Sequence, residues 1–373
     1  MTTNKKRVII IGASYGGILA LKTLLGTKKC HTNHTLLDIT IIAPNDQTYF
    51  NIASPRLLTE LDLTPKVVFK IKDVITKLSS GTEHAVKFVQ GTVKNVDLDD
   101  KSLTISNSDK IFGYDNLIIA SGTRTDFPGF KLDNERDQNY SLEAIKTLAK
   151  EIEIAKSIAI IGGGSTGVEV AGELGYKYGK QKEEIVLYTG ASRPLLDLPE
   201  NQSLKAARKL EQLGITIVNN DRAKVSGNSV LLTDGSTAEY SLVIKAYSHI
   251  PNTEFLSAEV LNEKGYIITD NQMRLTKYPE VICLGDVLEI GLRSVVDLVY
   301  AQKSVFESTV QVEVFGSTTK SKTYTRPSST TMVVPIGKEG GVGMAFGWNV
   351  PNFLVSHLKA KDFMISHAGD NLS

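Results

Sequence analysis

Two glycine-rich stretches of the sequence have the residue types and the spacing to bind the pyrophosphate of a dinucleotide. They lie at 7–17 and 158–174. Each follows an apolar run typical of a strand buried in a parallel sheet, and each precedes an apolar pattern typical of a helix. In this context a G-x-G-x-x-G pattern leaves the N–H groups at the helix start free to hold phosphate oxygens. The chemistry indicated is the binding of two dinucleotides.

The first stretch supplies six candidate cofactor-binding residues, namely Gly12, Ala13, Ser14, Tyr15, Gly16 and Gly17. Gly12 is expected to form the tight turn, and Gly17 to let the helix pack closely on the strand. Ser14 stands where the pattern has its middle glycine, and its small side chain still permits close approach of the backbone. An isolated match of this kind is also compatible with an ordinary tight turn of an α/β protein.

The second stretch satisfies the pattern in full, with Gly162, Gly164 and Gly167 as candidate binding residues. It follows the first by about one domain length. Two dinucleotide sites in one chain predict two dinucleotides. The simplest pair for a redox enzyme is a flavin that stays bound as a cofactor and a nicotinamide that binds and dissociates as a co-substrate.

The composition argues against several other classes of protein. The 373 residues carry a net charge of +1, which gives no sign of a nucleic-acid-binding surface. The two cysteines, Cys30 and Cys283, are far apart, which argues against a disulfide framework and against a local dithiol pair. No apolar run approaches the ~18 residues of a membrane span. We expect an intracellular, cytoplasmic protein without a metal site, and leave peripheral membrane or mitochondrial association open.

The elements that must position these motifs follow from the apolar pattern. A small antiparallel meander is predicted over 86–120, and the strand after it ends in Ser121 and Gly122, small residues suited to a backbone that lies against a cofactor. Another apolar run, 281–287, is predicted to be a strand that rejoins the first domain. Its Asp286 could hold the ribityl hydroxyls of a flavin. A helix over 294–310 would direct its positive end at the flavin pyrimidine.

Three charged side chains each have two interpretations. Arg56, beside Pro55, either faces the flavin or its pyrophosphate, or is a solvated surface arginine. Glu169 either orients the nicotinamide or relays a proton as a catalytic residue, or belongs to a solvated helix face; we favour the first. Arg193 follows a strand that ends at Thr189 without an acid. It either pairs with the 2′-phosphate of NADPH or is a loop arginine in solvent.

The sequence therefore predicts an α/β fold with two Rossmann-like dinucleotide-binding domains. The first domain is discontinuous, over 1–125 and 265–320, and the second covers 126–264. A small α+β C-terminal region covers 321–373, with a strand that ends in Gly337, a second strand that is rich in glycine, and an amphipathic helix over 350–365. The apolar side chains of that helix either pack on the body of the protein or contact a membrane surface.

Several stretches together resemble a known family. They are 11–17, 51–56, 114–122, 161–174, 284–287 and 332–343. The chain is similar to the flavoproteins of the apoptosis-inducing-factor-like group. Within it, the chain most resembles the ferroptosis-suppressor type of NAD(P)H:quinone oxidoreductase, with type II NADH dehydrogenases as cousins.

The resemblance implies FAD at the first fingerprint, with Arg56, the backbone near Val93 and Asp286 as further contacts. It implies NAD(P)H at the second fingerprint and a quinone-type electron acceptor. Ser248 stands where the family has a glycine, between the bulky Tyr247 and His249.

The activity expected is that of an FAD-dependent oxidoreductase that takes a hydride from NAD(P)H onto flavin N5 and passes electrons to a quinone. One rival is a reductase of a protein electron acceptor. The other is a slow-turnover, NAD(P)H-binding redox sensor, which Tyr247 and His249 beside the second site would suit. The turnover number separates the sensor from the enzyme.

Overall fold

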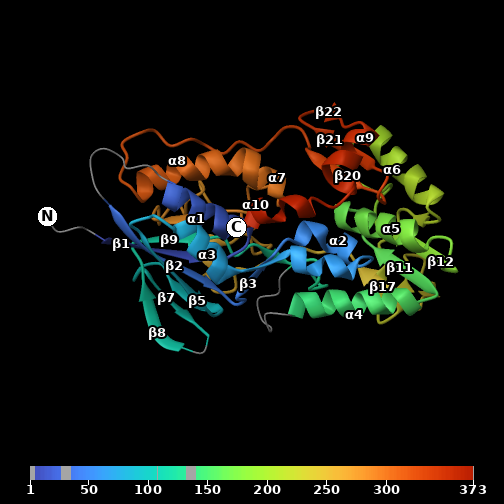
Figure 1. The fold of residues 1–373 in the computed structure, drawn as a ribbon, viewed down its shortest axis with the longest axis horizontal. Helices are drawn as coiled ribbons and strands as arrows, with labels where there is room; N and C mark the ends of the chain where they lie inside the picture. The colour runs from blue at the N-terminus through green and yellow to red at the C-terminus, as the bar shows by residue number, and fades with distance from the viewer. Residues whose placement is uncertain (1–4, 27–34, 107, 132–139, 373) are drawn as a thin grey trace.

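The computed structural model describes residues 5–26, 35–106, 108–131 and 140–372. Cys30 and residues 132–139, near the start of the predicted second domain, lie outside these ranges. Figure 1 shows the first domain, in blue and cyan with α8 in orange, at one end and the second domain, in green, at the other. The C-terminal sheet, in red, lies beside the second domain. Within the described ranges, every helix falls short of the length and apolarity that a membrane span requires.

The first domain is built on a five-stranded parallel sheet in the order β19-β9-β1-β2-β5. These strands are β1 (Lys5–Ile11), β2 (Leu36–Ala43), β5 (Ala85–Gln90), β9 (Asn116–Ile119) and β19 (Val281–Cys283). The apolar run of β1 is buried because layers of side chains cover both faces of the sheet. Although β19 is remote in sequence, it pairs with β9 and so ends beside the first fingerprint.

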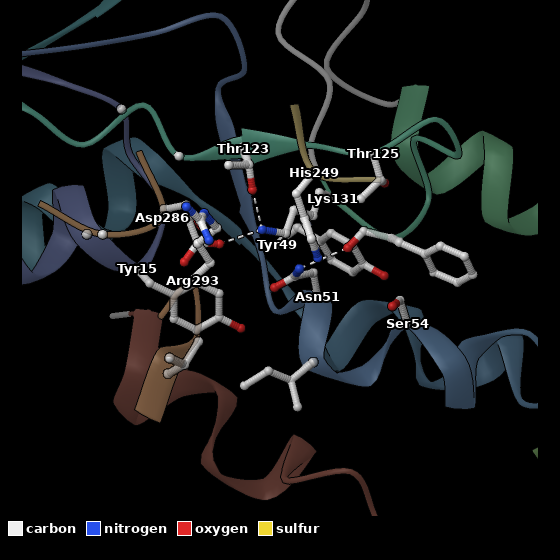
Figure 2. Close-up of a pocket in the computed structure, with 18 of the residues that line it drawn as sticks. Tyr15, Tyr49, Asn51, Ser54, Thr123, Thr125, Lys131, His249, Asp286 and Arg293 are labelled. Carbon is white, nitrogen blue, oxygen red and sulfur yellow. Dashed lines mark hydrogen bonds and ion pairs between the residues drawn. The ribbon is translucent and has the colours of Figure 1, made fainter. Parts of the chain in front are cut away.

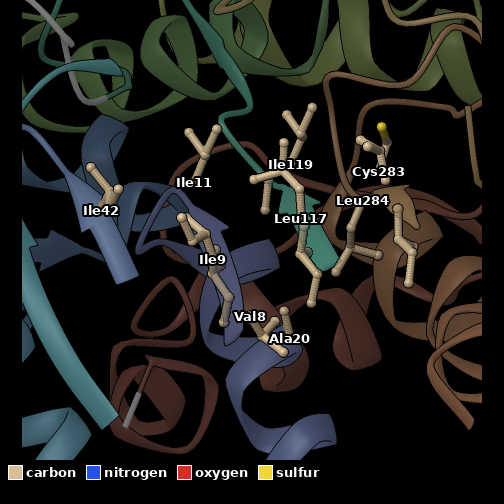
Figure 3. Packing of buried hydrophobic residues seen from close by; sticks show 14 of the residues in the cluster. Val8, Ile9, Ile11, Ala20, Ile42, Leu117, Ile119, Cys283 and Leu284 are labelled. Atoms are coloured by element: carbon tan, nitrogen blue, oxygen red, sulfur yellow. The ribbon is translucent and has the colours of Figure 1, made fainter. Parts of the chain in front are cut away.

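Helices α1 (Tyr15–Gly26) and α3 (Ile71–Ser79) pack with this sheet, and α8 (Lys303–Glu313) packs on α1. In Figure 3, Ala20 of α1 lies close to Val8 of β1, while Ile119 and Cys283 extend the same apolar core. Cys283 is fully buried and unpaired. The expected meander is present as β6 (Val93–Asp97), β7 (Ser102–Ile105) and β8 (Ser108–Gly113).

The second domain repeats the plan with a four-stranded parallel sheet in the order β13-β12-β11-β17. The strands are β11 (Ser157–Ile161), β12 (Glu184–Tyr188), β13 (Thr216–Val218) and β17 (Leu242–Lys245). Its helices are α4 (Tyr140–Ile154), α5 (Ser165–Tyr178) and α6 (Glu200–Gln212). A three-stranded antiparallel sheet adds β14 (Lys224–Ser226), β15 (Ser229–Leu231) and β16 (Thr237–Glu239).

Two short antiparallel pairs lie between the parallel sheets. β10 (Thr123–Arg124) pairs with β18 (Ile250–Pro251), so the chain leaving the first sheet is tied to the chain leaving the second. β3 (Gln47–Tyr49) pairs with β4 (Val68–Lys70). The short helices η1 (Asn51–Ala53), α2 (Ser54–Leu57) and η2 (Leu61–Lys66) lie between β3 and β4 in the chain. α2 packs against α5 of the second domain.

The C-terminal region is a three-stranded antiparallel sheet followed by short helices. Its strands are β20 (Met332–Pro335), β21 (Gly341–Ala345) and β22 (Trp348–Asn349). Gly172 of α5 permits the close approach of β20, since a Cβ there would lie 2.8 Å from the Cα of Ile336.

The helix expected over 350–365 is shorter and irregular. It consists of α9 (Asn352–Val355) and a π-helical turn, η5 (Ser356–Ala360), and Phe363 and Met364 then take left-handed conformations that end it. The chain continues through the 3₁₀ turn η6 (Ile365–His367) to α10 (Ala368–Leu372), which packs against α1.

Candidate functional site

A cavity of about 360 Å³ lies at the carboxyl ends of strands from both parallel sheets. In open α/β sheets this is the edge at which ligands bind. Its wall is drawn mainly from segments 12–16, 43–45, 120–123, 246–249, 284–286 and 293–295. Ser165, Thr166 and Glu169, from the first turns of α5, complete the side that faces the second domain. Both fingerprint regions therefore open onto one space.

A second cavity of about 230 Å³ adjoins the first. The two share Gly12, Pro44, Ser121 and Asn252 in their walls. Val93, at the start of the meander, lines the second cavity and not the first. Together the cavities form an elongated space that passes the first fingerprint, which is the shape that a long dinucleotide requires.

The glycines of the first fingerprint are needed where they stand. Gly12 has φ +105°, and a Cβ there would lie 2.3 Å from the carbonyl oxygen of Ala120. A Cβ on Gly17 would lie 1.9 Å from the carbonyl oxygen of Gly12, so this glycine lets α1 start directly on the turn. Ala13, Ser14, Tyr15 and Gly16 line the cavity at the start of α1. The N–H groups at this helix start suit the phosphates of a dinucleotide.

The second fingerprint uses the same geometry. Gly162 has φ +129°, and a Cβ there would lie 2.5 Å from the carbonyl oxygen of Ala246. A Cβ on Gly167 would lie 1.8 Å from the carbonyl oxygen of Gly162. Gly164 caps α5, and the space beside it is open. These three glycines shape the turn but do not themselves line the cavity.

Asp286 lines the cavity and is held by Lys131, a residue that the sequence motifs did not mark. The ammonium nitrogen of Lys131 lies 2.5 Å from an oxygen of Asp286 and 2.5 Å from the hydroxyl of Thr123 (Figure 2). Lys131 belongs to the chain that leaves the first domain, so only the folded arrangement brings it to Asp286. His249 lines the same wall. Partial burial and the nearby Lys131 lower the pKa of His249, and Asp286 opposes them.

A buried carboxylate holds the turn that carries Asp286. Asp297 accepts hydrogen bonds from the N–H of Leu292 (3.1 Å), the amide of Gln302 (2.7 Å) and the hydroxyl of Tyr324 (2.9 Å). Gln302 in turn accepts a hydrogen bond from the N–H of Gly285 at 2.8 Å. Sequence reasoning did not identify this network. The π-helical turn η4 (Leu298–Gln302) places the side chain of Gln302 beside the backbone of Gly285.

Glu169 lies in the cavity wall with a partner from the C-terminal region. Its side chain is only 8% exposed, and one oxygen lies 2.6 Å from the ammonium nitrogen of Lys359 of η5. Burial raises the pKa of Glu169, and the charge and hydrogen bond of Lys359 oppose this shift. The interpretation of Glu169 as part of a solvated helix face is therefore wrong. Lys359 also lines the cavity and had no sequence signal of its own.

Arg56 is neither a solvated surface residue nor part of the cavity wall where a flavin would lie. Its guanidinium is 1% exposed and lies outside the cavity wall, with Nε 2.5 Å from an oxygen of Glu173 on α5. Nη2 and Nη1 donate to the carbonyls of Ala360 (2.8 Å) and Lys361 (3.0 Å), and Phe363 stacks against the guanidinium. A buried guanidinium requires a paired carboxylate and satisfied donors. Arg56 therefore joins α2, α5 and the C-terminal region.

Three further residues of the second domain bear on the nicotinamide side. Tyr247, Ser248 and His249 line the cavity, and Ser248 has φ +74°, the conformation that a glycine would adopt without strain. The hydroxyl of Ser248 accepts a hydrogen bond from the N–H of Asp126 at 3.2 Å. Arg193 is half-buried and lies outside the walls of both cavities.

The residues present fit a flavin dinucleotide and a nicotinamide dinucleotide. Each fingerprint has a turn before a helix in which a Cβ on its glycines would clash with backbone atoms. The first residues of both helices line the same cavity. Asp286 and the backbone of Ser121 and Gly122 lie on the wall of the first domain. No cluster of histidine, cysteine and carboxylate side chains suited to a metal occurs among the described residues.

Comparison with known proteins agrees with this geometry. The sequence model of the family "Pyridine nucleotide-disulphide oxidoreductase" matches residues 6–308. Oxidoreductase ptaL of Pestalotiopsis fici is 27% identical, with 96% of this chain and 96% of that protein covered. Ferroptosis suppressor protein 1 of Xenopus tropicalis is 25% identical, covering 96% of this chain and 94% of the relative.

The fold is also found among solved structures. The sulfide:quinone oxidoreductase of Aquifex aeolicus superposes with a TM-score of 0.73 at 16% identity, over 98% of this chain and 92% of that chain. The α/β fold of two dinucleotide-binding domains that the sequence predicts is confirmed, as is the expectation of FAD and NAD(P)H. The chain belongs to the pyridine nucleotide-disulphide oxidoreductase family.

Proposed function

We propose that this protein is an FAD-dependent oxidoreductase that takes electrons from NAD(P)H and passes them to a quinone-type acceptor. One observation carries the proposal, namely that the two fingerprint helices, α1 and α5, open onto the same cavity. When bound there, FAD supplies the electron-transfer chemistry between the nicotinamide and the acceptor. The chain's own part is to bind the two dinucleotides and to hold them in contact.

On the first-domain side, the start of α1 would bind the pyrophosphate, with Gly12 and Gly16 permitting its approach. Val93 lines the adjoining cavity, which would take the adenosine end. Asp286 would accept hydrogen bonds from ribityl hydroxyls, since its carboxylate reaches the cavity from a turn held by Asp297 and Gln302. Lys131 pairs with this carboxylate and orients it.

The chain after Asp286 brings a helix start to the same wall. Ser294 and Val295 line the cavity, and Ser294 caps the helical stretch that begins at Val295 by accepting a hydrogen bond from the N–H of Asp297. The partial positive charge of a helix start stabilises an adjacent negative charge. This end of the helix would therefore favour a negatively charged, reduced cofactor.

On the second-domain side, Glu169 and Lys359 would orient the nicotinamide. A carboxylate at this depth can accept a hydrogen bond from a carboxamide, and the Lys359 ammonium holds it in place. Glu169 is thus our candidate catalytic residue. Gly162, Gly164 and Gly167 would shape the pyrophosphate site at the start of α5.

The acceptor is proposed from similarity and from the shape of the site. The name of the similar sulfide:quinone oxidoreductase specifies a quinone. The cavity wall includes apolar side chains, among them Ile52, Phe130 and Leu298, which suit a lipophilic ring. The described residues also lack a local cysteine pair that could pass electrons to a disulfide.

A redox-sensing role is the second candidate, and Tyr247 and His249 favour it because these bulky residues stand in the cavity wall on the nicotinamide side. Stopped-flow reduction of the yellow protein by NADH and by NADPH, followed by a short-chain ubiquinone, separates the two. Fast bleaching of the flavin and prompt reoxidation by quinone are expected. Slow bleaching into a stable charge-transfer complex would instead support the sensor, and fast bleaching without reoxidation would point to another acceptor.

A further inference from the structure

Arg293 brings a guanidinium group to the cavity wall without a partner of opposite charge. Figure 2 shows it among the residues that line the cavity, together with Asp286, Lys131 and His249. Among the described residues, none accepts a hydrogen bond from its buried Nε, and no carboxylate forms an ion pair with it. Buried polar atoms in native proteins are nearly always hydrogen-bonded. An orphaned donor in a cavity wall therefore indicates that a ligand supplies the acceptor.

The backbone at Arg293 is also strained. Its φ is +54°, in the left-handed region that glycine adopts without cost and that other residues seldom adopt. Strained residues persist where the surrounding structure holds them, and they cluster at ligand sites. The strain at Arg293 is thus a second indication that the placement of this side chain serves the site.

Tyr266 holds the guanidinium in place. The centre of its buried ring lies 3.9 Å from Cζ of Arg293. Its hydroxyl donates a hydrogen bond to the backbone carbonyl of His249 at 3.0 Å, and its ring lies outside the cavity wall. An aromatic face orients a guanidinium and leaves the N–H groups at its edge free to donate. Tyr266 is therefore a positioning residue, which fixes Arg293 relative to the chain that leaves the second sheet.

The charged groups around Arg293 leave this part of the cavity positive. Lys131 and Asp286 form an ion pair, so their charges offset each other. Burial, Lys131 and Arg293 lower the pKa of His249, and Asp286 opposes them, so the imidazole is biased toward its neutral form. The charge of Arg293 is left without compensation. A partly buried cation of this kind favours an anionic ligand beside it.

The position of Arg293 along the elongated space decides which anionic group it meets. The start of α1 would hold the pyrophosphate, and the adjoining cavity would hold the adenosine end. Arg293 lines the first cavity and not the second, so it lies with the flavin end of the dinucleotide. A hydride from NAD(P)H brings two electrons and one proton to the neutral, oxidised ring. The ring then carries one negative charge, and NAD(P)+ is released.

We propose that Arg293, positioned by Tyr266, stabilises the negative charge of the reduced flavin ring and thereby raises its midpoint potential. A fixed cation in a site shielded from water stabilises charge that develops there. The oxidised ring is neutral, so Arg293 favours the reduced state over the oxidised one. This inference rests on the proposed function for the placement of the flavin, and it does not depend on which acceptor removes the electrons.

The test is the midpoint potential of the bound flavin, measured on the full, FAD-loaded chain during slow chemical reduction beside a reference dye. Arg293→Met should lower the potential by about 30 mV, which is a tenfold loss of preference for the reduced state in a two-electron couple. Arg293→Gly removes the same charge and relieves the backbone strain. It should lower the potential equally with thermal stability near that of the wild type, and both variants should keep their content of oxidised FAD.

The pH dependence of the potential gives a second measurement. Where the reduced ring is anionic, reduction takes up one proton for two electrons, and the potential falls by about 30 mV per pH unit. Where the reduced ring is neutral, two protons are taken up and the slope is about 60 mV per pH unit. Loss of the cation should raise the pKa of the reduced ring, so in Arg293→Met the change of slope should move up by about one pH unit.

Matched substitutions separate the charge from its support. Arg222→Met removes an exposed arginine of the second domain that lines neither cavity, and it should leave the potential unchanged. Tyr266→Phe keeps the ring against the guanidinium and should keep the potential. Tyr266→Leu removes the ring and should give about half of the fall that Arg293→Met gives.

A potential that Arg293→Met leaves unchanged would overturn the inference. Weaker binding of NADH alongside the unchanged potential would assign Arg293 to the phosphates of the nicotinamide dinucleotide instead. The proposed function fails separately. If NAD(P)H does not bleach the wild-type protein, or a quinone does not reoxidise it, the proposed function is wrong. The midpoint potential still decides the role of Arg293 in that case, because the flavin is reduced chemically in this measurement.

Discussion

The ammonium nitrogen of Lys359 and a carboxylate oxygen of Glu169 lie 2.6 Å apart in the wall of the cavity. Glu169 stands on the helix of the second fingerprint, and Lys359 comes from the C-terminal region. The pair therefore closes the site with a residue from outside both dinucleotide-binding domains. Because burial raises the pKa of Glu169 and Lys359 is the largest opposing influence, the pair also sets the pH range in which the carboxylate is charged.

Removal of the lysine charge should shift the pH dependence of flavin reduction. Burial raises the pKa of Glu169, and Lys359 is the main group that lowers it. In Lys359→Met the pKa of Glu169 should therefore rise, and the carboxyl should keep its proton to higher pH. The limb of the pH–rate profile that Glu169 controls should move upward, and Glu169→Gln should abolish it. Stopped-flow bleaching by NADH across the pH range measures this. A profile that neither variant moves would remove Glu169 from the reaction.

The same variant makes a prediction for stability. A carboxyl with a pKa raised in the folded protein binds more protons folded than unfolded, so the free energy of unfolding falls as pH rises through the interval between the two pKa values. Lys359→Met should raise the upper end of this interval, so that stability continues to fall to higher pH. Glu169→Gln in the Lys359→Met background should remove this pH dependence. Chemical unfolding at a series of pH values checks both, with wild-type protein as the reference.

Arg56 should be needed for stability rather than for flavin affinity. Arg56→Met leaves Glu173 buried without its partner, a change that costs about 3–5 kcal/mol. Because Arg56 lies outside the cavity wall, the fraction that remains folded should bind FAD with nearly wild-type affinity. Urea unfolding and fluorescence titration with FAD measure the two quantities separately.

The double variant Arg56→Met/Glu173→Met is the control for Arg56, since it removes both buried charges and should recover much of the lost stability. One outcome would instead assign Arg56 to the flavin site. In that outcome, Arg56→Met would lower the affinity for FAD by tenfold or more while leaving the unfolding curve unchanged.

The first and the middle glycine of the second fingerprint should respond differently to alanine. At Gly164 a Cβ meets open space, so Gly164→Ala should fold normally and keep FAD, yet weaken NAD(P)H binding because the methyl group occupies the side on which a pyrophosphate would approach. At Gly162 a Cβ meets the carbonyl oxygen of Ala246 at 2.5 Å, so Gly162→Ala should also destabilise the fold.

Flavin content, thermal unfolding and the concentration of NADH that half-saturates bleaching distinguish these variants. Gly26→Ala, at the open end of α1, is the neutral control. Wild-type NADH binding by Gly164→Ala would place the nicotinamide dinucleotide elsewhere.

Asp297 should control how tightly FAD is held without touching it. Asp297→Ala removes the acceptor for Leu292, Gln302 and Tyr324, and thereby frees the Gly285–Asp286 turn. We expect faster release of FAD and a loss of stability of about 3 kcal/mol. Tyr324→Phe removes one of these hydrogen bonds and should cost about 1 kcal/mol. If FAD release is the same in Asp297→Ala as in wild type, the turn does not depend on this network.

The sequence predicts the fold well because the signals that specify it are local. Val8 to Ile11 followed by Gly12 specify a buried strand and a turn within a few residues, and the same holds for 158–167. The limits of the C-terminal helix were less predictable, because the left-handed residues Phe363 and Met364 that end it have no marked turn preference. Phe363 takes this conformation where its ring packs against the guanidinium of Arg56, a contact between segments remote in sequence.

By itself, then, the sequence determined the two dinucleotide-binding turns, because glycine spacing and apolar runs act through backbone geometry over short distances. Only the tertiary structure decided which charges meet. Lys131 and Asp286 are 155 residues apart, Glu169 and Lys359 are 190 apart, and Arg56 and Glu173 are 117 apart. Such pairs depend on how whole domains and the C-terminal region pack, and no short pattern of residues encodes that packing.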